Sequence, residues 1–484
     1  MMAHPLSQRI ADVLDLDPDA GAIQFDGQWS CWGQIAALAG HIEKITGPAR
    51  VGIMLRNHPV HVAALLGVLA AGGTVVVINP ARGDDRTRAD LEALALPVVV
   101  GLAEDLAHLM PAHSPRTTRV AIAGLDTEPV VTAAESPATD AGGPGVAVWM
   151  LTSGTTGPPK RVDLTYDMLA RSVMGREPEK CPAPTELRRG VAIVNSPLVH
   201  VGGVFRVLLC IAEARPFVLL PKFELQRWAA AVREHRPRAV SLVPAALRTV
   251  LHSDLTREDL AGVRVVTSGT APLSADDADA FTEKFGIPVL TSYAATEFGG
   301  GVAGWTLPDH GKYWKDKRGS VGRANPGAQL RVVDENGAPL GPDEPGLLEV
   351  IPAQMGPGSP WMRTTDLARI DADGFLWVLG RADQAIIRGG FKVMPDDVRA
   401  ALESHPAVLG ASVIGVADER LGETPVAMVE LRGPATPDEL AGYLQGRLAR
   451  YEIPTRITIV DAIPRTPSGK ADLRAVRDHL ESGG

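Results

Sequence analysis

The chain has 484 residues, of which 45% are hydrophobic and 22% are charged, the composition of a globular protein with about three domain-sized units. Its net charge of −9 excludes a general electrostatic attraction to nucleic acid or to an anionic membrane, so any basic binding site must be local. The scattered cysteines Cys31, Cys181 and Cys210 match neither a disulfide framework nor a zinc motif. Residues 1–20 lack the apolar core of a signal peptide, and we therefore expect a cytoplasmic protein with no nucleic-acid partner and no stable membrane insertion.

Apolar segments in the first two thirds of the chain alternate between strand and helix patterns. Residues 50–55, 60–71 and 74–78 fit a strand, a helix and a strand, which predicts a parallel sheet covered by helices. Gly72 and Gly73 interrupt this apolar region, so it is not expected to span a membrane. Residues 126–144, rich in Pro, Ala, Thr and Gly, are expected to form a connector. The alternation then resumes, with strands expected at 191–194, 217–220, 239–243 and 263–266 and a helix at 225–234.

The remaining part of the chain predicts a smaller α+β unit. Strands are expected at 411–414 and 426–429, and helices near 398–404 and 440–450. The whole chain is therefore expected to have an α/β fold, with a large N-terminal part of parallel-rich sheets flanked by helices and a small C-terminal part.

A cluster of hydroxyl groups, glycines and one lysine follows the apolar run 146–150. Gly154 and Gly157 allow the backbone to approach a ligand closely, and hydroxyl and amide donors beside an ammonium group suit a polyphosphate. Pro158 and Pro159 separate the second glycine from Lys160, so the segment is not a Walker A loop. A plain surface turn is the alternative, and the choice depends on the motifs downstream. The candidate phosphate-binding residues are Thr152, Ser153, Gly154, Thr155, Thr156, Gly157 and Lys160.

This segment resembles the phosphate-binding loop of the acyl-CoA synthetases in the adenylate-forming (ANL, AMP-binding enzyme) superfamily. Further segments resemble motifs of that family and occur in the family's order, at residues 196–203, 267–273, 293–300, 361–366, 380–391 and 464–470. The chain is identified on this basis as a member of the family. The resemblance implies an acyl-CoA synthetase/luciferase-like fold, with an N-terminal AMP-binding domain at 1–382, a mobile C-terminal domain at 383–484 and a hinge at Asp383.

The resemblance implies a nucleotide site for ATP. Tyr293 would stack on adenine, Thr296 would hold the α-phosphate, and Asp366 would accept the ribose hydroxyls. Arg381 would contact the ribose or the phosphates, and Glu297 would bind Mg²⁺ together with Thr155. The remaining residues implied for this site are Ser268, Gly269, Thr270, Ala271, Pro272, Ser292, Ala294 and Ala295.

The resemblance also implies an acyl site. A lone histidine in an apolar segment is most often a core residue, but in this motif His200 would line the acyl site or its gate. The neutral, glycine-rich wall favours a hydrophobic acid, and residues 297–305 are similar to actinobacterial synthetases acting on bulky or polycyclic carboxylates. The acyl-binding residues implied are His200, Val201, Gly202, Gly203, Phe205, Thr267, Gly300 and Gly301.

The C-terminal motifs imply the rest of a two-step reaction. Lys470 would bridge the attacking carboxylate and the α-phosphate, and with Thr296, Glu297 and His200 it completes the catalytic set. The small domain would then turn about its hinge and admit coenzyme A, whose pantetheine arm would pass Arg388, Gly389, Gly390 and Phe391. The expected activity is that of an acid–thiol ligase whose partners are a small-molecule carboxylic acid, ATP and CoA.

Other readings stay open at this point. Arg161, Ala294 and Thr365 differ from the residues usual in the family and flank nucleotide motifs, so an enzyme specialised for one half-reaction is an alternative. An enzyme that loads a carrier protein is less favoured, because no carrier segment follows Lys470. An inactive nucleotide-binding protein is disfavoured by the retained Thr296, Glu297, Asp366 and Lys470. A homodimer is left open.

Overall fold

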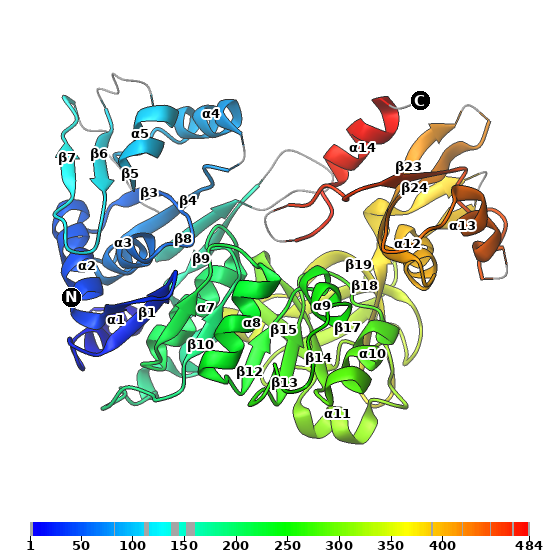
Figure 1. The fold of residues 1–484 in the computed structure, drawn as a ribbon, viewed down its shortest axis with the longest axis horizontal. Helices are drawn as coiled ribbons and strands as arrows, with labels where there is room; N and C mark the ends of the chain where they lie inside the picture. The colour runs from blue at the N-terminus through cyan, green and yellow to red at the C-terminus, as the bar shows by residue number, and fades with distance from the viewer. Residues whose placement is uncertain are drawn as a thin grey trace.

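A computed structural model (Figure 1) describes residues 3–81, 83–110, 116–136, 145–151, 160–388, 391–418, 420–445, 447–466 and 469–482. Within these ranges the predicted α/β architecture is confirmed, since the sheets of the large N-terminal part contain parallel strands with helices against them. The candidate residues 152–157 of the phosphate loop and Gly389 and Gly390 lie outside the described residues.

The first sheet has seven strands in the order β7-β6-β5-β3-β4-β8-β9. Its centre is the predicted strand–helix–strand unit: β3 and β4 are parallel, with Arg50 opposite Thr74, and both are buried because helices cover the two faces. The intervening helix begins with Pro59 after His58, whose Nδ1 accepts a hydrogen bond from the Val60 amide. The strands are β3 (Arg50–Met54), β4 (Thr74–Ile78), β5 (Val98–Leu102), β6 (Thr118–Ile122), β7 (Val130–Thr132), β8 (Val146–Leu151) and β9 (Arg161–Thr165).

The prediction of a connector at 126–144 is wrong for residues 130–132, and residues 137–144 lie outside the described ranges. Residues 130–132 form the edge strand β7, because their backbone pairs antiparallel with β6 in the register Val131 to Val120. The helices of this region are α1 (Pro5–Leu14), α2 (Trp32–Thr46), α3 (Pro59–Ala70), α4 (Asp84–Leu94), α5 (Ala103–Leu109) and α6 (Tyr166–Met174), with the 3₁₀ turn η1 (Pro178–Lys180).

Two further sheets continue the large domain. The order of one is β10-β11-β1-β2, and the order of the other is β12-β13-β14-β15-β16, parallel up to β14 and antiparallel beyond it. The strands are β1 (Gly21–Phe25), β2 (Gln28–Cys31), β10 (Ala192–Val194), β11 (Phe217–Leu219), β12 (Ala239–Ser241), β13 (Val265–Ser268), β14 (Val289–Ala295), β15 (Gly300–Gly304) and β16 (Arg323–Ala324). The helices are α7 (Val201–Ala212), α8 (Leu225–His235), α9 (Pro244–Leu251), α10 (Ala275–Phe285) and α11 (Leu307–Tyr313), with η2 (Thr296–Phe298).

An antiparallel sheet, β17-β18-β19-β20, leads to the end of the large domain. The predicted hairpin at 371–374 is confirmed: the Asp371 carboxylate accepts hydrogen bonds from the amides of Asp373 and Phe375. The hairpin sets Asp366 on β19 opposite Arg381 on β20. The elements are β17 (Gln329–Val333), β18 (Gly346–Ile351), β19 (Met362–Ile370) and β20 (Leu376–Arg381), with η3 (Ala353–Met355) and η4 (Ala382–Gln384).

The C-terminal part has its own sheet and its own core, built from residues that follow η4. Its helix expected at 440–450 instead spans 437–444, because Thr436 and Glu439 form a capping box that starts the helix earlier. In Figure 1 this part lies at the opposite end of the molecule from the N-terminal sheet. Its elements are β21 (Ile386–Arg388), β22 (Phe391–Val393), α12 (Pro395–Glu403), β23 (Val408–Asp418), β24 (Gly422–Leu431), α13 (Pro437–Leu444), β25 (Arg456–Val460) and α14 (Leu473–Ser482). None of the helices described is both long and apolar enough to span a membrane.

Candidate active site

The nucleotide-site candidates on β14 and β19 meet each other in the structure. The Tyr293 hydroxyl donates a hydrogen bond to Oδ2 of Asp366. Desolvation raises the pKa of both groups, and the neighbouring carboxylate raises the pKa of the tyrosine further. A partly desolvated carboxylate held by a sheet is a suitable acceptor for ribose hydroxyls.

Arg381 and the proposed hinge residue form a fork-to-fork ion pair. The guanidinium contacts both carboxylate oxygens of Asp383, at 2.9 Å from Nε and 2.7 Å from Nη2. Arg381 also lowers the pKa of Asp366 electrostatically, although desolvation of that carboxyl outweighs this effect. The arginine therefore couples the expected ribose carboxylate to the segment that joins the two parts of the chain.

Lys470 belongs to the small C-terminal part, but its charge contributes to the pKa shifts of residues in the large part. Solvent still reaches the lysine, yet the surrounding protein is dense enough that desolvation lowers its pKa, as does Arg381 to a smaller extent. The carboxylates of Asp366 and Glu297 oppose this shift in the pKa of Lys470. The structure therefore brings the predicted lysine, the ribose carboxylate and the expected Mg²⁺ ligand to one place.

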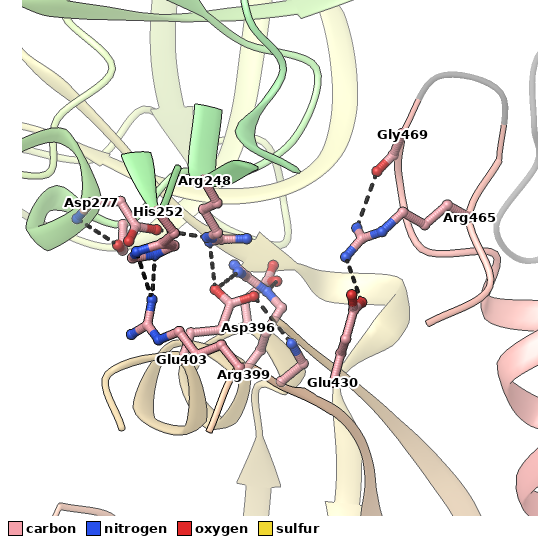
Figure 2. A network of polar contacts seen from close by, with 12 residues as sticks. Arg248, His252, Asp277, Asp396, Arg399, Glu403, Glu430, Arg465 and Gly469 are labelled. Atoms are coloured by element: carbon pink, nitrogen blue, oxygen red, sulfur yellow. Dashed lines mark hydrogen bonds and ion pairs between the residues drawn. The ribbon is translucent and has the colours of Figure 1, made fainter. Parts of the chain in front are cut away.

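The loop that presents Lys470 is held from several sides. The Thr466 amide donates to the Lys470 carbonyl at 2.7 Å, and Arg465 donates to the Gly469 carbonyl at 3.3 Å. Arg465 also lies 3.5 Å from the Glu430 carboxylate, as Figure 2 shows. Gly469 has a left-handed backbone (φ 81°) and a Cβ there would lie 3.2 Å from Cγ2 of Val243, so the loop rests against the large domain.

A cluster of charges clamps the two parts together beside α9 and α12 (Figure 2). Arg248 of the large domain donates to Asp277 at 2.7 Å and to Glu403 of the small domain at 2.8 Å. Arg399 donates to the same Glu403 oxygen at 2.7 Å and to Asp396 at 3.1 Å. The side chains of Arg248 and Glu403 are only 9% and 6% exposed, which distinguishes this contact from a surface ion pair. We name these five residues the interdomain clamp.

Sequence reasoning missed the interdomain clamp. In the sequence, Arg248, Arg399 and Glu403 look like ordinary solvent-facing charges on amphipathic helices. Arg399 and Glu403 lie four residues apart on α12, but only the docking of α12 beside α9 reveals the pairing of Glu403 with Arg248.

His200 precedes the first turn of α7. Its Nε2 is buried and has no hydrogen-bond partner among the described residues. Desolvation, with a smaller contribution from the charge of Lys470, lowers the pKa of His200 to about 4. The ring is therefore neutral near pH 7 and can contact a bound molecule without adding charge.

The other acyl-site candidates fall into two groups. A Cβ on Gly203 would lie 2.1 Å from the Pro197 carbonyl oxygen, and Val201 and Phe205 pack on the core of the large domain. A Cβ on Gly202 would meet no atom within 4 Å, so open space lies beside it. Helix α7 contacts β15, which carries Gly300 and Gly301.

A charged residue also lies on α7, the helix that carries several of the acyl-site candidates. Arg206 on α7 donates from Nη2 to Oγ1 of Thr267 at 3.1 Å. Sequence reasoning did not single out Arg206. The signal that could have found it is its spacing, because a residue four positions beyond Gly202 lies on the same face of the helix.

The structure also describes candidate residues on the β13–α10 loop and at the CoA motif. Thr270 has a left-handed backbone (φ 72°), a strained state for a β-branched residue. Ser268 Oγ is buried without a partner among the described residues. Arg388 donates to the carbonyls of Tyr451 and Ile453 at 2.7 and 3.2 Å, whereas Phe391 is exposed and stacked on Tyr451.

The departures from the family pattern also become interpretable. Arg161 pairs with Asp90 at 2.6 Å and donates to the Val77 carbonyl at 3.0 Å, so it ties β9 to β4 and α4. Lys160, next to it, is exposed, as are Ala294 and Thr365. The arginine therefore has an internal structural partner.

The described residues contain no group of three or more side chains able to hold a metal ion by themselves. Glu297 is exposed and close enough to Lys470 to affect its pKa. This donor set suits Mg²⁺, which is typically held by one or two carboxylates together with water and substrate phosphates.

Comparison with known proteins identifies the family to which the chain belongs. The model of the AMP-binding enzyme family matches residues 15–358, and that of the AMP-binding enzyme C-terminal domain matches residues 397–470. The chain therefore belongs to the AMP-binding enzyme family, as an acyl-CoA synthetase of the adenylate-forming superfamily. Its class of activity is that of an AMP-forming carboxylic acid–CoA ligase.

Among curated proteins, the chain is 29% identical over 466 residues to 4-coumarate–CoA ligase-like 5 of Oryza sativa subsp. japonica, covering 91% of this chain and 80% of that protein. It is 29% identical over 348 residues to 2-succinylbenzoate–CoA ligase of Bacillus mycoides, covering 68% and 69% of the two chains.

Among solved structures, ATP-bound MatB from Rhodopseudomonas palustris matches with a TM-score of 0.80 at 24% identity, covering 99% of both chains. The o-succinylbenzoate CoA synthetase MenE from Bacillus subtilis, in complex with its acyl-adenylate intermediate, matches with a TM-score of 0.77 at 23% identity over 99% of this chain and 98% of that one. At these identities the two likenesses concern the fold.

His200 is expected to be neutral at every pH above about 5. Because the folded protein binds this proton only near pH 4 and the unfolded chain binds it near 6.5, stability should fall as the pH decreases through this window, by up to about 3 kcal/mol. Unfolding of the wild type and of His200→Gln between pH 7 and pH 4 measures the effect, and the variant should lose less stability. A wild-type His200 that titrates near pH 6.5 by NMR would contradict this.

Proposed function

We propose that this protein is an ATP-dependent acyl-CoA synthetase that activates a hydrophobic, bulky carboxylic acid as an acyl adenylate and transfers the acyl group to CoA. The observation that carries the proposal is the position of Lys470, which the C-terminal domain presents beside Asp366, Glu297 and His200. The relatives named for 4-coumarate and 2-succinylbenzoate support the same two-step activity.

In the first step the carboxylate attacks the α-phosphorus of ATP and pyrophosphate leaves. Two negatively charged reactants must approach each other, so catalysis depends mainly on alignment and on neutralising charge. We assign the cationic contact to the ammonium of Lys470 and the ribose contact to Asp366, with Tyr293 holding that carboxylate. The phosphate loop that ends at Lys160 and the hydroxyl of Thr296 would provide further donors.

We propose Glu297 as a protein ligand of Mg²⁺. When bound, the ion would offset the negative charge of the phosphate oxygens. Thr155, expected as a second ligand, lies outside the described residues.

In the second step the CoA thiol attacks the acyl carbonyl and AMP leaves. We propose that the domains are 1–382 and 383–484, and that the small one turns about Asp383 between the steps, withdrawing Lys470 and bringing the 388–391 segment to the cleft. The interdomain clamp supports this, because it binds the small domain in the orientation that holds Lys470 at the large one. The clamp must open during the turn.

The experiment that tests the function is a panel of carboxylic acids incubated with ATP and CoA, with mass spectrometry of the thioesters and assays of AMP and pyrophosphate. The expected result is one thioester and one AMP for each ATP consumed. Pyrophosphate exchange without a thioester, thioester formation only from supplied acyl adenylate, or transfer only to a carrier protein would overturn the two-step reading.

Lys470→Ala should slow adenylation by about 10²–10³-fold, the usual loss for one well-placed donor to a developing charge. Pyrophosphate exchange measures this step, and thioester formation from a supplied acyl adenylate should remain. Lys44→Ala, which removes an exposed lysine on α2, is the matched control and should leave both steps unchanged. Equal losses in both steps for Lys470→Ala would count against its assigned role.

Glu403→Gln should weaken the orientation that presents Lys470. Neutralising a buried carboxylate that contacts two guanidinium groups should lower the adenylation rate about fivefold to tenfold without slowing thioester formation from acyl adenylate. Asp259→Asn breaks an exposed ion pair with Arg233 inside the large domain and serves as the control. If both half-reactions change in parallel, the clamp does not select between orientations.

A further inference from the structure

Arg206 is a cation that the described part of the fold leaves without an anion. Its guanidinium is half-buried and donates to Thr267 Oγ1 at 3.1 Å, but no carboxylate among the described residues pairs with it. Among the residues that the structure describes, the acidic group that influences its pKa is the Cys210 thiol. Burial raises the pKa of that thiol to about 12, so it carries no negative charge near pH 7.

Three other buried or half-buried arginines have hydrogen-bond or ion-pair partners among the described residues. Arg161 pairs with Asp90, Arg248 pairs with Asp277 and Glu403, and Arg9 donates to the carbonyls of Cys181, Pro182 and Ala212. A guanidinium has five N–H donors, and withdrawing its charge from water without a counter-charge is unfavourable. Arg9 also has no carboxylate partner but donates to three carbonyls, whereas Arg206 donates to one hydroxyl among the described residues, which indicates that a partner of Arg206 comes from outside the chain.

The position of Arg206 points to the acyl site. Side chains of a helix lean toward its N-terminus, so the Arg206 side chain extends toward Gly202, one turn earlier on the same face of α7. Gly202 borders open space, and Thr267, which holds the guanidinium, lies on β13. The anion-free guanidinium therefore lies along the wall already assigned to the acyl group.

The anion expected at Arg206 is distinct from the carboxylate that reacts beside Lys470. Lys470 acts on the pKa of His200, which lies at the start of α7. Six residues separate His200 from Arg206, roughly 9 Å along the helix axis. An anion at Arg206 is therefore a few bonds away from the carboxylate that is activated beside Lys470.

We infer that the acid activated by this enzyme carries a second carboxylate, which Arg206 binds while the first one reacts. A planar guanidinium matches a carboxylate with two parallel hydrogen bonds, and its fixed position would select the length of the spacer between the two acid groups. The inference rests on the proposed function and narrows its substrate class from hydrophobic acids to dicarboxylic acids with an apolar spacer.

The test compares symmetric dicarboxylic acids of increasing spacer length, aliphatic and aromatic, with their monomethyl esters. The wild type should prefer one diacid over its ester in kcat/KM, and Arg206→Met should lose about thirtyfold or more for that diacid, mainly through KM, while the ester reacts as before. Arg206→Lys should restore part of the loss. Equal use of diacid and ester by the wild type would overturn the inference while leaving CoA ligation itself intact.

Two further readouts separate this role from others. Arg206→Met should unfold at the same temperature as the wild type or higher, because an unpaired charge is removed, whereas Arg161→Met, which breaks an ion pair, should unfold at a lower one. A lowered unfolding temperature for Arg206→Met would assign Arg206 a structural role instead. A raised KM for ATP or CoA with a monoester substrate would assign its anion to those ligands and overturn the inference.

Calorimetry with the diacid alone distinguishes failure of the inference from failure of the proposed function. Binding that depends on Arg206 supports the site even if no thioester forms. Absence of such binding, with thioesters formed from monocarboxylic acids, removes the site and keeps the ligase.

Discussion

The ion pair between Arg248 and Glu403 is the contact on which the described arrangement of the active site depends. It joins a helix of the large domain to a helix of the small one, away from solvent, and each partner has a second opposite charge to hold it. Because charges so placed lose much of their stabilisation when separated, the contact favours one orientation of the small domain. In that orientation Asp366 and Glu297 lie close enough to Lys470 to affect its pKa, although more than a hundred residues separate the lysine from the nearer of the two in the sequence.

The charged residues near Lys470 differ in whether another protein group pairs with them. Asp366 is partly desolvated and receives the hydroxyl of Tyr293, while Arg381 is committed to Asp383. Desolvation, with a smaller contribution from Lys470, keeps His200 neutral near pH 7, so the positive charge beside it comes from Lys470. Arg206 stands apart, because the fold holds its guanidinium with a threonine and supplies no carboxylate among the described residues. Charges paired within the protein maintain its shape, and those without a protein partner are available to ligands.

Several sequence inferences depended on local order and were confirmed. The parallel unit around β3 and β4, the hairpin after β19 and the α/β class follow from apolar periodicity and turn residues, which act over a few neighbours. Other inferences failed where distant segments meet. The connector predicted at 126–144 contains a strand because its backbone pairs with the edge of β6. Arg161 differs from the family motif, and the structure shows that it pairs with Asp90. The sequence analysis did not single out Arg206, the one charged residue of α7, and its contact with Thr267 on β13 shows where its guanidinium lies.

By itself, the sequence determined the family and the order of its motifs, because hydroxyl, glycine and lysine patterns such as those ending at Lys160 and Lys470 are local and specific in combination. It also named candidate side chains for the chemistry, such as Asp366 and Lys470, and their roles stay predictions. Only the tertiary structure decided which charges neutralise one another, since ion pairs such as Arg248–Glu403 form between residues brought together by folding. It likewise decided that Arg206 is half-buried beside Thr267, because burial is a property of packing that no single segment encodes.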